Sequence, residues 1–141
     1  VNDDVELAAE VEAPAVHLGG DDAPLAAARS RLGPEVILGA SCYDSLERAD
    51  ALRAAGADYL AFGRVFDSPT KPDSRAVPWQ TLSEASQRYP CPVVAIGGVT
   101  AANAEPLVAL GVDAVAVISG VFAATDPEAE AARIAALFRA D

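Results

Sequence analysis

Short, unbroken runs of apolar residues recur along this chain and constrain its fold more than any other feature. They lack the alternation of a half-exposed strand, so they are typical of strands buried on both faces of a parallel sheet. Segments with helical periodicity separate them, and this alternation predicts an α/β fold. The predicted strands are Ala15–Leu18, Val36–Ala40, Tyr59–Val65, Val93–Ile96 and Ala114–Ile118. The predicted helices are Val5–Glu12, Leu25–Leu32, Ser45–Ala55, Trp79–Arg88, Ala102–Leu110 and Pro127–Arg139.

An internal echo supports a repeating β/α unit. The stretches AAGADYLAF (54–62) and ALGVDAVAV (109–117) share a helix end, a glycine, an aspartate and a strand. Gly56 and Gly111 stand where a helix C-terminus needs a left-handed residue. Strand spacing and order of this kind fit either a parallel (β/α) barrel or a self-contained, doubly wound five-stranded sheet.

Composition narrows the classes of function. A net charge of −11 argues against a nucleic-acid partner, whose phosphates need a basic surface. The sequence contains no run long and apolar enough for a membrane span and opens with no leader, so a cytoplasmic location is expected. Cys42 and Cys91 are expected to be reduced thiols. The chain starts at Val1 and contains no methionine, so we expect a longer parent chain or a fusion to an N-terminal segment.

Small and polar residues follow the predicted strands at their carboxyl ends, where parallel β/α folds place their sites. Gly97-Gly98 follows the fourth strand and Ser119-Gly120 follows the fifth. Backbone N–H groups at such glycine turns can bind a phosphate, and a phosphate-binding pair of loops is favoured over two simple turns.

The loop after the third strand carries the only lysine of the chain, Lys71, with Ser68 and Thr70 beside it. Two hydroxyls and a compact ammonium suit a phosphate group. A solvated surface lysine is the alternative, but arginine is the usual surface cation of this chain.

Other candidates are ambiguous on their residues alone. Asp22 is a possible Mg²⁺ ligand, but a solvated acid at a helix N-terminus explains it better. His17, the single histidine, lies inside an apolar run and fits a core or lining side chain better than a base. Asn2 and Asp3 are uninformative by themselves.

In combination, these motifs resemble the C-terminal five β/α units of the thiamine phosphate synthase family. The matching stretches are VND at the start, VHLGGDD, GASCYDSLE, FGRVFDSPTKP, PVVAIGGVTAANA and VAVISGVF, in the family's order. The resemblance implies a TIM-type barrel represented by residues 1–141 as strands 4 to 8, with the first three β/α units absent.

The resemblance also implies a transferase of thiamine biosynthesis. The family couples hydroxymethylpyrimidine diphosphate to thiazole phosphate and releases pyrophosphate, and a chain without the first three units is expected to be inactive alone. By resemblance, Mg²⁺ is held by Asp3 and Asp22; Asn2, Ser41 and Lys71 contact the diphosphate substrate, with Ser41 and Lys71 catalytic; and Ser68, Thr70, Gly98, Ile118 and Ser119 contact thiazole phosphate.

Two positions depart from the family pattern. Gly20 stands where glutamine is usual, and Asp67 stands where proline is usual. One alternative is the related thiazole tautomerase, which uses a histidine where this chain has Tyr43. Another is a non-catalytic phosphate-binding domain of a fused protein.

Overall fold

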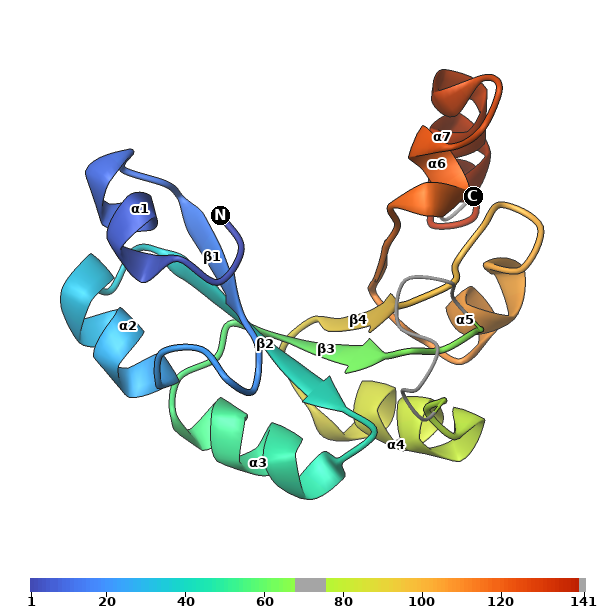
Figure 1. Ribbon diagram of the computed structural model, residues 1–141. Helices are drawn as coiled ribbons and strands as arrows, with labels where there is room; N and C mark the ends of the chain where they lie inside the picture. Colours follow the sequence, from blue (N-terminus) through green and yellow to red (C-terminus); the bar gives the residue numbers. More distant parts are fainter. Residues whose placement is uncertain (68–75, 140–141) are drawn as a thin grey trace.

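The computed structural model describes residues 1–67 and 76–139, and it contains one parallel sheet (Figure 1). The strands follow the chain in the order β1-β2-β3-β4-β5, and each neighbouring pair is parallel. The five predicted strands are confirmed, and their observed bounds are β1 Ala15–Leu18, β2 Ile37–Tyr43, β3 Tyr59–Gly63, β4 Val93–Ile96 and β5 Ala114–Ala116.

Sequential order decides between the two predicted sheets. A doubly wound sheet reverses its strand order at a switch point, whereas here each strand lies beside the next one in the chain. The doubly wound alternative is therefore wrong. What the structure contains is an open five-stranded sheet with alternating helices.

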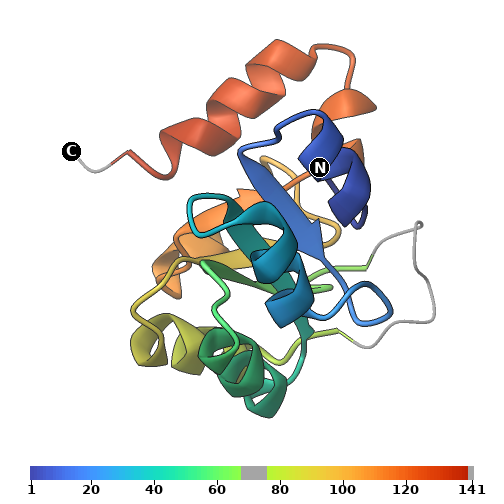
Figure 2. The ribbon, with the colours of Figure 1, turned by 90° about the vertical axis from the view of Figure 1, so that its left-hand side faces the viewer.

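Helices line the outer side of this sheet (Figure 1). The pairs in contact include α2 with β2, α3 with β2 and β3, and α4 with β4. Both views place α7 at the far end of the molecule from α3 and α4 (Figure 2), where it packs on α6. The helices are α1 Val5–Glu10, α2 Leu25–Leu32, α3 Leu46–Ala54, α4 Trp79–Arg88, α5 Glu105–Ala109, α6 Ser119–Phe122 and α7 Pro127–Ala136.

Helix starts follow the local capping chemistry. Ser45 Oγ accepts a hydrogen bond from Arg48 N at 3.1 Å, and Asp126 Oδ1 accepts one from Ala129 N at 3.0 Å. Each satisfies an N–H group that the first helical turn leaves without a partner. The short α6 was not predicted, because four residues carry too little periodicity to reveal a helix.

The core lies between the sheet and its helices. Leu38, Leu60 and Val93 are fully buried at 0% exposure. The neighbouring positions on β1 to β3 point to the opposite, inner side, as the pleat requires. His17, Ser41 and Tyr59 are half-buried positions on this inner side, and the residue that follows each of them (Leu18, Cys42 or Leu60) is buried.

Two aspartates join neighbouring strands, and they occupy the same place in the internal echo. Asp58 N donates to Leu38 O at 2.8 Å, while Asp58 Oδ2 accepts from Leu38 N at 2.8 Å. Asp113 makes the same two-way contact with Val93, at 2.9 and 2.7 Å. The aspartate of each repeat thus makes two hydrogen bonds with the backbone near the start of the preceding strand.

The two hydrogen bonds between Asp58 and Leu38, which we call the Asp58 clasp, should contribute measurably to the stability of the fold. Partial burial raises the pKa of Asp58, but the Leu38 N–H and the Arg29 guanidinium outweigh it, so the net pKa lies below the usual value. Asp58→Ala leaves the buried Leu38 N–H without its acceptor, and we expect a loss of about 1 kcal/mol in the free energy of unfolding at pH 7. Urea denaturation followed by circular dichroism measures it.

The lowered pKa of Asp58 determines the direction in which its contribution to stability changes with pH. A lowered folded-state pKa stabilises the fold above the ordinary pKa of an aspartate, and this contribution disappears as the pH falls through the folded value. The difference in the free energy of unfolding between the parent and Asp58→Ala should therefore become smaller as the pH falls. Asp21→Ala, at an exposed position, is the control, and an equal loss there would contradict the role of the clasp.

Candidate functional site

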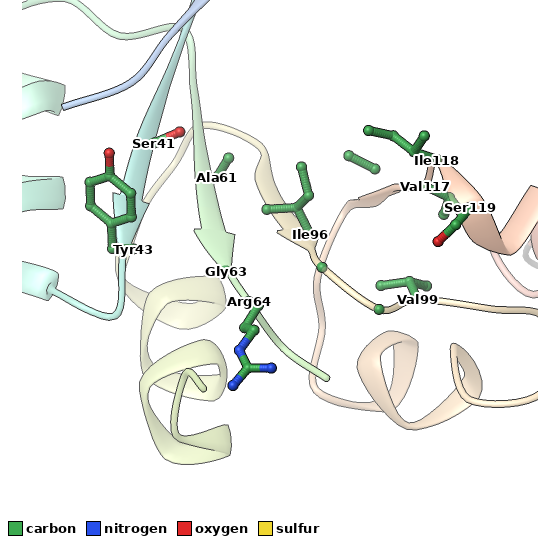
Figure 3. A pocket seen from close by; sticks show the side chains of 13 residues that line it. Ser41, Tyr43, Ala61, Gly63, Arg64, Ile96, Val99, Val117, Ile118 and Ser119 are labelled. Carbon is green, nitrogen blue, oxygen red and sulfur yellow. The ribbon is translucent and has the colours of Figure 1, made fainter. Parts of the chain in front are cut away.

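A cavity of about 290 Å³ opens at the carboxyl ends of the strands (Figure 3). It extends from Ser41 and Tyr43 on β2, past Ile96 on β4, to Ile118 and Ser119 after β5. Ser41, Gly98, Ile118 and Ser119, four of the predicted site residues, share it. The full lining is Ser41, Tyr43, Ala61, Gly63, Arg64, Ile96, Gly97, Gly98, Val99, Ala116, Val117, Ile118 and Ser119.

The loop after β4 needs glycine for two reasons. Gly97 and Gly98 have φ angles of +103° and +68°, a region that side chains rarely adopt. A Cβ on Gly98 would lie 2.5 Å from Asp67 O, so the loop packs directly on the backbone that follows β3. Asn103 fixes the turn, because its Nδ2 donates to Gly98 O at 3.0 Å and its Oδ1 accepts from Thr100 N at 2.7 Å.

The loop after β5 packs just as closely on its neighbour. A Cβ on Gly120 would lie 2.2 Å from Val99 O, so the two loops touch through backbone atoms. α6 begins at Ser119, and Ile118 in the N-cap position provides no side-chain cap. Ile118 is 73% exposed, which leaves an apolar side chain at the edge of the cavity. The two predicted loops, Gly97-Gly98 and Ser119-Gly120, therefore form one wall of backbone and small residues, which we call the glycine wall.

Ser41 lies at the other end of the cavity, and a neighbouring residue of the sheet holds its side chain in place. The register between β2 and β3 shifts between Ser41 and Tyr43, an irregularity of the kind that re-aims side chains beside active sites. Ser41 Oγ lies 2.8 Å from His17 Nε2, and His17 Nδ1 lies 2.9 Å from the Tyr59 hydroxyl. Burial lowers the pKa of His17, while the charges of Asp3 and Asp22 act in the opposite direction.

The acidic candidates gather at a second cavity of about 560 Å³, lined by Asp3, Asp4, Glu6 and Asp22 among others. Asp22 Oδ2 accepts a 2.5 Å hydrogen bond from Gly19 N, and Asp3 N donates to His17 O at 2.8 Å. No cluster of three or more metal-binding side chains occurs within residues 1–67 and 76–139.

Asn2 extends the sheet beside β1. It forms an isolated parallel bridge with His17, so its backbone lies next to the strand that carries the histidine. The structure thus brings Asn2, Asp3 and Asp22 to the β1 side, and Ser41 stands between them and the glycine loops.

Comparison with known proteins agrees with this geometry. The family model described as thiamine monophosphate synthase matches residues 1–121. This chain belongs to that family. The thiamine-phosphate synthases of Thioalkalivibrio sulfidiphilus and Halorhodospira halophila are 54% and 53% identical to it over 138 and 136 residues, covering 98% and 96% of this chain. It spans 65% of the length of each of these relatives.

A solved structure supports the same assignment. The thiamine phosphate pyrophosphorylase of Pyrococcus furiosus superposes with a TM-score of 0.88 at 38% identity, covering 98% of this chain and 65% of that one. A 3-hexulose-6-phosphate synthase superposes with a TM-score of 0.70 at 19% identity, a likeness that concerns the fold alone.

Three of the residues assigned by family resemblance cannot be placed. Ser68, Thr70 and Lys71 lie outside the described residues. The segments on either side are described. Arg64 Nη1 pairs with Asp67 Oδ1 at 2.8 Å beside the cavity.

Two residues that line the cavity were missed from sequence. Arg64 lines the cavity and follows β3 directly, a position that the strand-end rule could have flagged. Sequence reasoning did not assign Tyr43 to the site, yet Tyr43 lines the cavity and its hydroxyl accepts from Gly20 N at 2.9 Å. A Cβ on Gly20 would lie 2.8 Å from that hydroxyl. Tyr43 therefore occupies space beside Gly20, where the family usually has a larger residue.

No helix in residues 1–67 or 76–139 is both long and apolar enough to cross a bilayer.

Gly98 provides a direct test of the glycine wall. Gly98→Ala puts a Cβ within 2.5 Å of Asp67 O and strains a φ of +68°, so the loop must move. For thiazole phosphate, the ligand that the family resemblance implies, we expect the affinity measured by calorimetry to fall by more than roughly tenfold. Ser119→Ala removes at most one hydroxyl contact and should change affinity by only about threefold to tenfold.

Gly33→Ala is the matched control. Gly33 also has a positive φ of +89°, but nothing lies within 4 Å of its Cβ position. This variant reproduces the backbone strain away from the cavity. Unchanged affinity in Gly98→Ala, or an equal loss in Gly33→Ala, would place the phosphate elsewhere.

Proposed function

We propose that this chain forms the larger part of a thiamine phosphate synthase, an enzyme that joins hydroxymethylpyrimidine diphosphate to thiazole phosphate and releases pyrophosphate. One observation carries the proposal. Ser41, Gly98, Ile118 and Ser119, chosen by resemblance to that family, line a single cavity at the carboxyl ends of the strands. Sequence relatives that bear this name support it.

We also propose that the sheet is an arc of a TIM-type barrel. Five parallel strands in sequential order, with helices along the outer side, match that architecture. Five strands cannot close a barrel of eight, and the chain spans 65% of its relatives. The family's first three β/α units would complete the ring between β5 and β1.

The two ends of the cavity suit two different anions. The glycine wall presents backbone and small residues, which allow close approach of the thiazole phosphate. Ser41 at the opposite end offers a hydroxyl to the diphosphate substrate, with Asn2 nearby on the β1 side. Substrates held this way place the thiazole nitrogen against the carbon that loses pyrophosphate, so positioning lowers the barrier.

The residues present fit a magnesium ion. Asp3 and Asp22 line one cavity, and both act electrostatically on His17. Mg²⁺ is usually held by one or two carboxylates, with water and substrate phosphate completing its shell, so two aspartates suffice. When bound, the ion would neutralise charge on the departing pyrophosphate.

Activity is best assayed on the chain joined to the remaining segment of the Thioalkalivibrio sulfidiphilus relative, with the chain alone in parallel. The expected product of the joined protein is thiamine phosphate, with one pyrophosphate released per turnover. If the joined protein folds and binds thiazole phosphate but forms no thiamine phosphate, a phosphate-binding domain replaces the synthase as the explanation.

Removal of one carboxylate should change the magnesium requirement. For Asp22→Asn in the joined protein, we expect the Mg²⁺ concentration that gives half-maximal pyrophosphate release to rise by at least roughly tenfold, a loss typical even of groups that only orient a metal ligand. Asp21→Asn removes a neighbouring exposed charge and serves as the control. Equal magnesium curves for the two variants would remove Asp22 from the metal site.

Lys71 should act on turnover more than on binding. A cation that strengthens its contact as pyrophosphate leaves stabilises the transition state more than the bound substrates. Lys71→Ala is therefore expected to lower turnover strongly while thiazole phosphate affinity stays within about twofold, and Lys71→Arg should be impaired as well. Arg133→Ala, on α7, is the control, and equal turnover in the parent and Lys71→Ala would contradict the role.

A further inference from the structure

A gap in the side chains of β2 lets residues of β1 and β3 meet. His17 pairs in register with Gly39, and Gly39 pairs with Tyr59, so the three residues form one row across the sheet. A Cβ on Gly39 would lie 1.9 Å from Tyr59 Cζ. Glycine alone leaves room for the tyrosine ring to stack on the imidazole, with ring centroids 5.6 Å apart.

Both imidazole nitrogens of His17 have partners in this arrangement. Nδ1 lies 2.9 Å from the Tyr59 hydroxyl and Nε2 lies 2.8 Å from Ser41 Oγ. Ser41 lines the cavity, whereas His17 and Tyr59 are not among its lining residues. Of these three residues Ser41 is the one that lines the cavity, and His17 contacts it at the serine hydroxyl.

Chemistry selects the direction of these hydrogen bonds. A neutral imidazole has one N–H, so one nitrogen donates and the other accepts. If Nδ1 carries the proton, Ser41 must donate to Nε2 and presents only lone pairs to the cavity. If Nε2 carries it, Tyr59 donates to Nδ1, His17 donates to Ser41, and the serine O–H is left to donate into the cavity. Diphosphate oxygens only accept, so they require the second arrangement.

We propose that Tyr59 and His17 form a one-way hydrogen-bond chain that turns the Ser41 hydroxyl into a donor for the diphosphate of the substrate. The proposal rests on the proposed function, which supplies the diphosphate. His17 is a positioning residue in it, because it acts through Ser41. The geometry that carries this hydrogen-bond chain is the pair of contacts that His17 makes with the Tyr59 hydroxyl and with Ser41 Oγ.

Nitrogen-15 NMR of the 141-residue chain reads the direction of the chain without any assay of activity. His17 is the only histidine, so a sample labelled at histidine gives a single imidazole spin system. We expect a protonated Nε2 and an unprotonated Nδ1 at neutral pH. Tyr59→Phe removes the donor to Nδ1 and should reduce the population of that tautomer. A dominant Nδ1–H form in the parent would overturn the proposal.

Two amide variants separate the two nitrogens of His17. Glutamine carries its amide about where Nε2 stands, so His17→Gln can still donate to Ser41. Asparagine carries its amide about where Nδ1 stands, so His17→Asn keeps only the Tyr59 side. With Mg²⁺ and inorganic pyrophosphate as the probe, we expect affinity within about threefold of the parent for His17→Gln and a loss of roughly tenfold for His17→Asn, the effect of one hydrogen bond.

A double-mutant cycle tests whether the histidine acts through the serine. Ser41→Ala should lose as much pyrophosphate affinity as His17→Asn, and the double variant should lose no more than either. Inorganic phosphate binding at the glycine wall should be the same in all variants, which controls for folding. Additive losses would give His17 a separate role and overturn the proposal. If the parent, joined to the remaining segment of the Thioalkalivibrio sulfidiphilus relative, binds no pyrophosphate, the proposed function is contradicted, and the tautomer alone decides whether the hydrogen-bond chain from Tyr59 to Ser41 exists.

Discussion

Burial of one face of a parallel sheet is the constraint on which the rest of this molecule depends. Leu38, Leu60 and Val93 are fully buried beneath the helices. Because side chains alternate along a strand, burying these residues fixes their neighbours on the opposite face. A slip of one residue would exchange the two sets. Burial of this apolar face therefore determines that Ser41 and its partners stand on the inner side, although these residues contribute little to the buried face itself.

Much of the fold could be predicted from sequence because its signals are local. A strand buried on both faces is a continuous apolar run, and such a run is visible without knowledge of its partner. Boundaries were less accurate. The third strand was expected to reach Val65 but ends at Gly63, although Val65 N still donates to Ile96 O at 3.0 Å. A run of apolar residues shows burial, and burial continues past the point where the strand geometry stops.

The candidate site was predicted in part, and the missing part has a common cause. Gly98 and Ser119 lie within three residues of the ends of β4 and β5, so the strand-end rule finds them. The link between His17 and Ser41 joins residues 24 positions apart, and it depends on the register of two strands. Gly39, which lies between His17 and Tyr59 in the sheet, looks in the sequence like an ordinary strand glycine. Nothing local shows that a tyrosine from β3 lies over it.

On the proposed function, a protein with a net charge of −11 binds two phosphorylated substrates, and the proposed arrangement of the site accounts for this. Backbone N–H groups of a glycine loop carry no net charge to be cancelled by surrounding acids. A hydroxyl held as a donor by a neutral histidine, as proposed for Ser41 and His17, is equally independent of the protein's overall charge. On the same proposal Asp3 and Asp22 make use of the acidity, because carboxylates would hold a divalent cation that a diphosphate also binds. In the described part of the cavity wall Arg64 is paired with Asp67, so on this proposal anion binding there depends on directed dipoles and a shared metal rather than on an excess of basic residues.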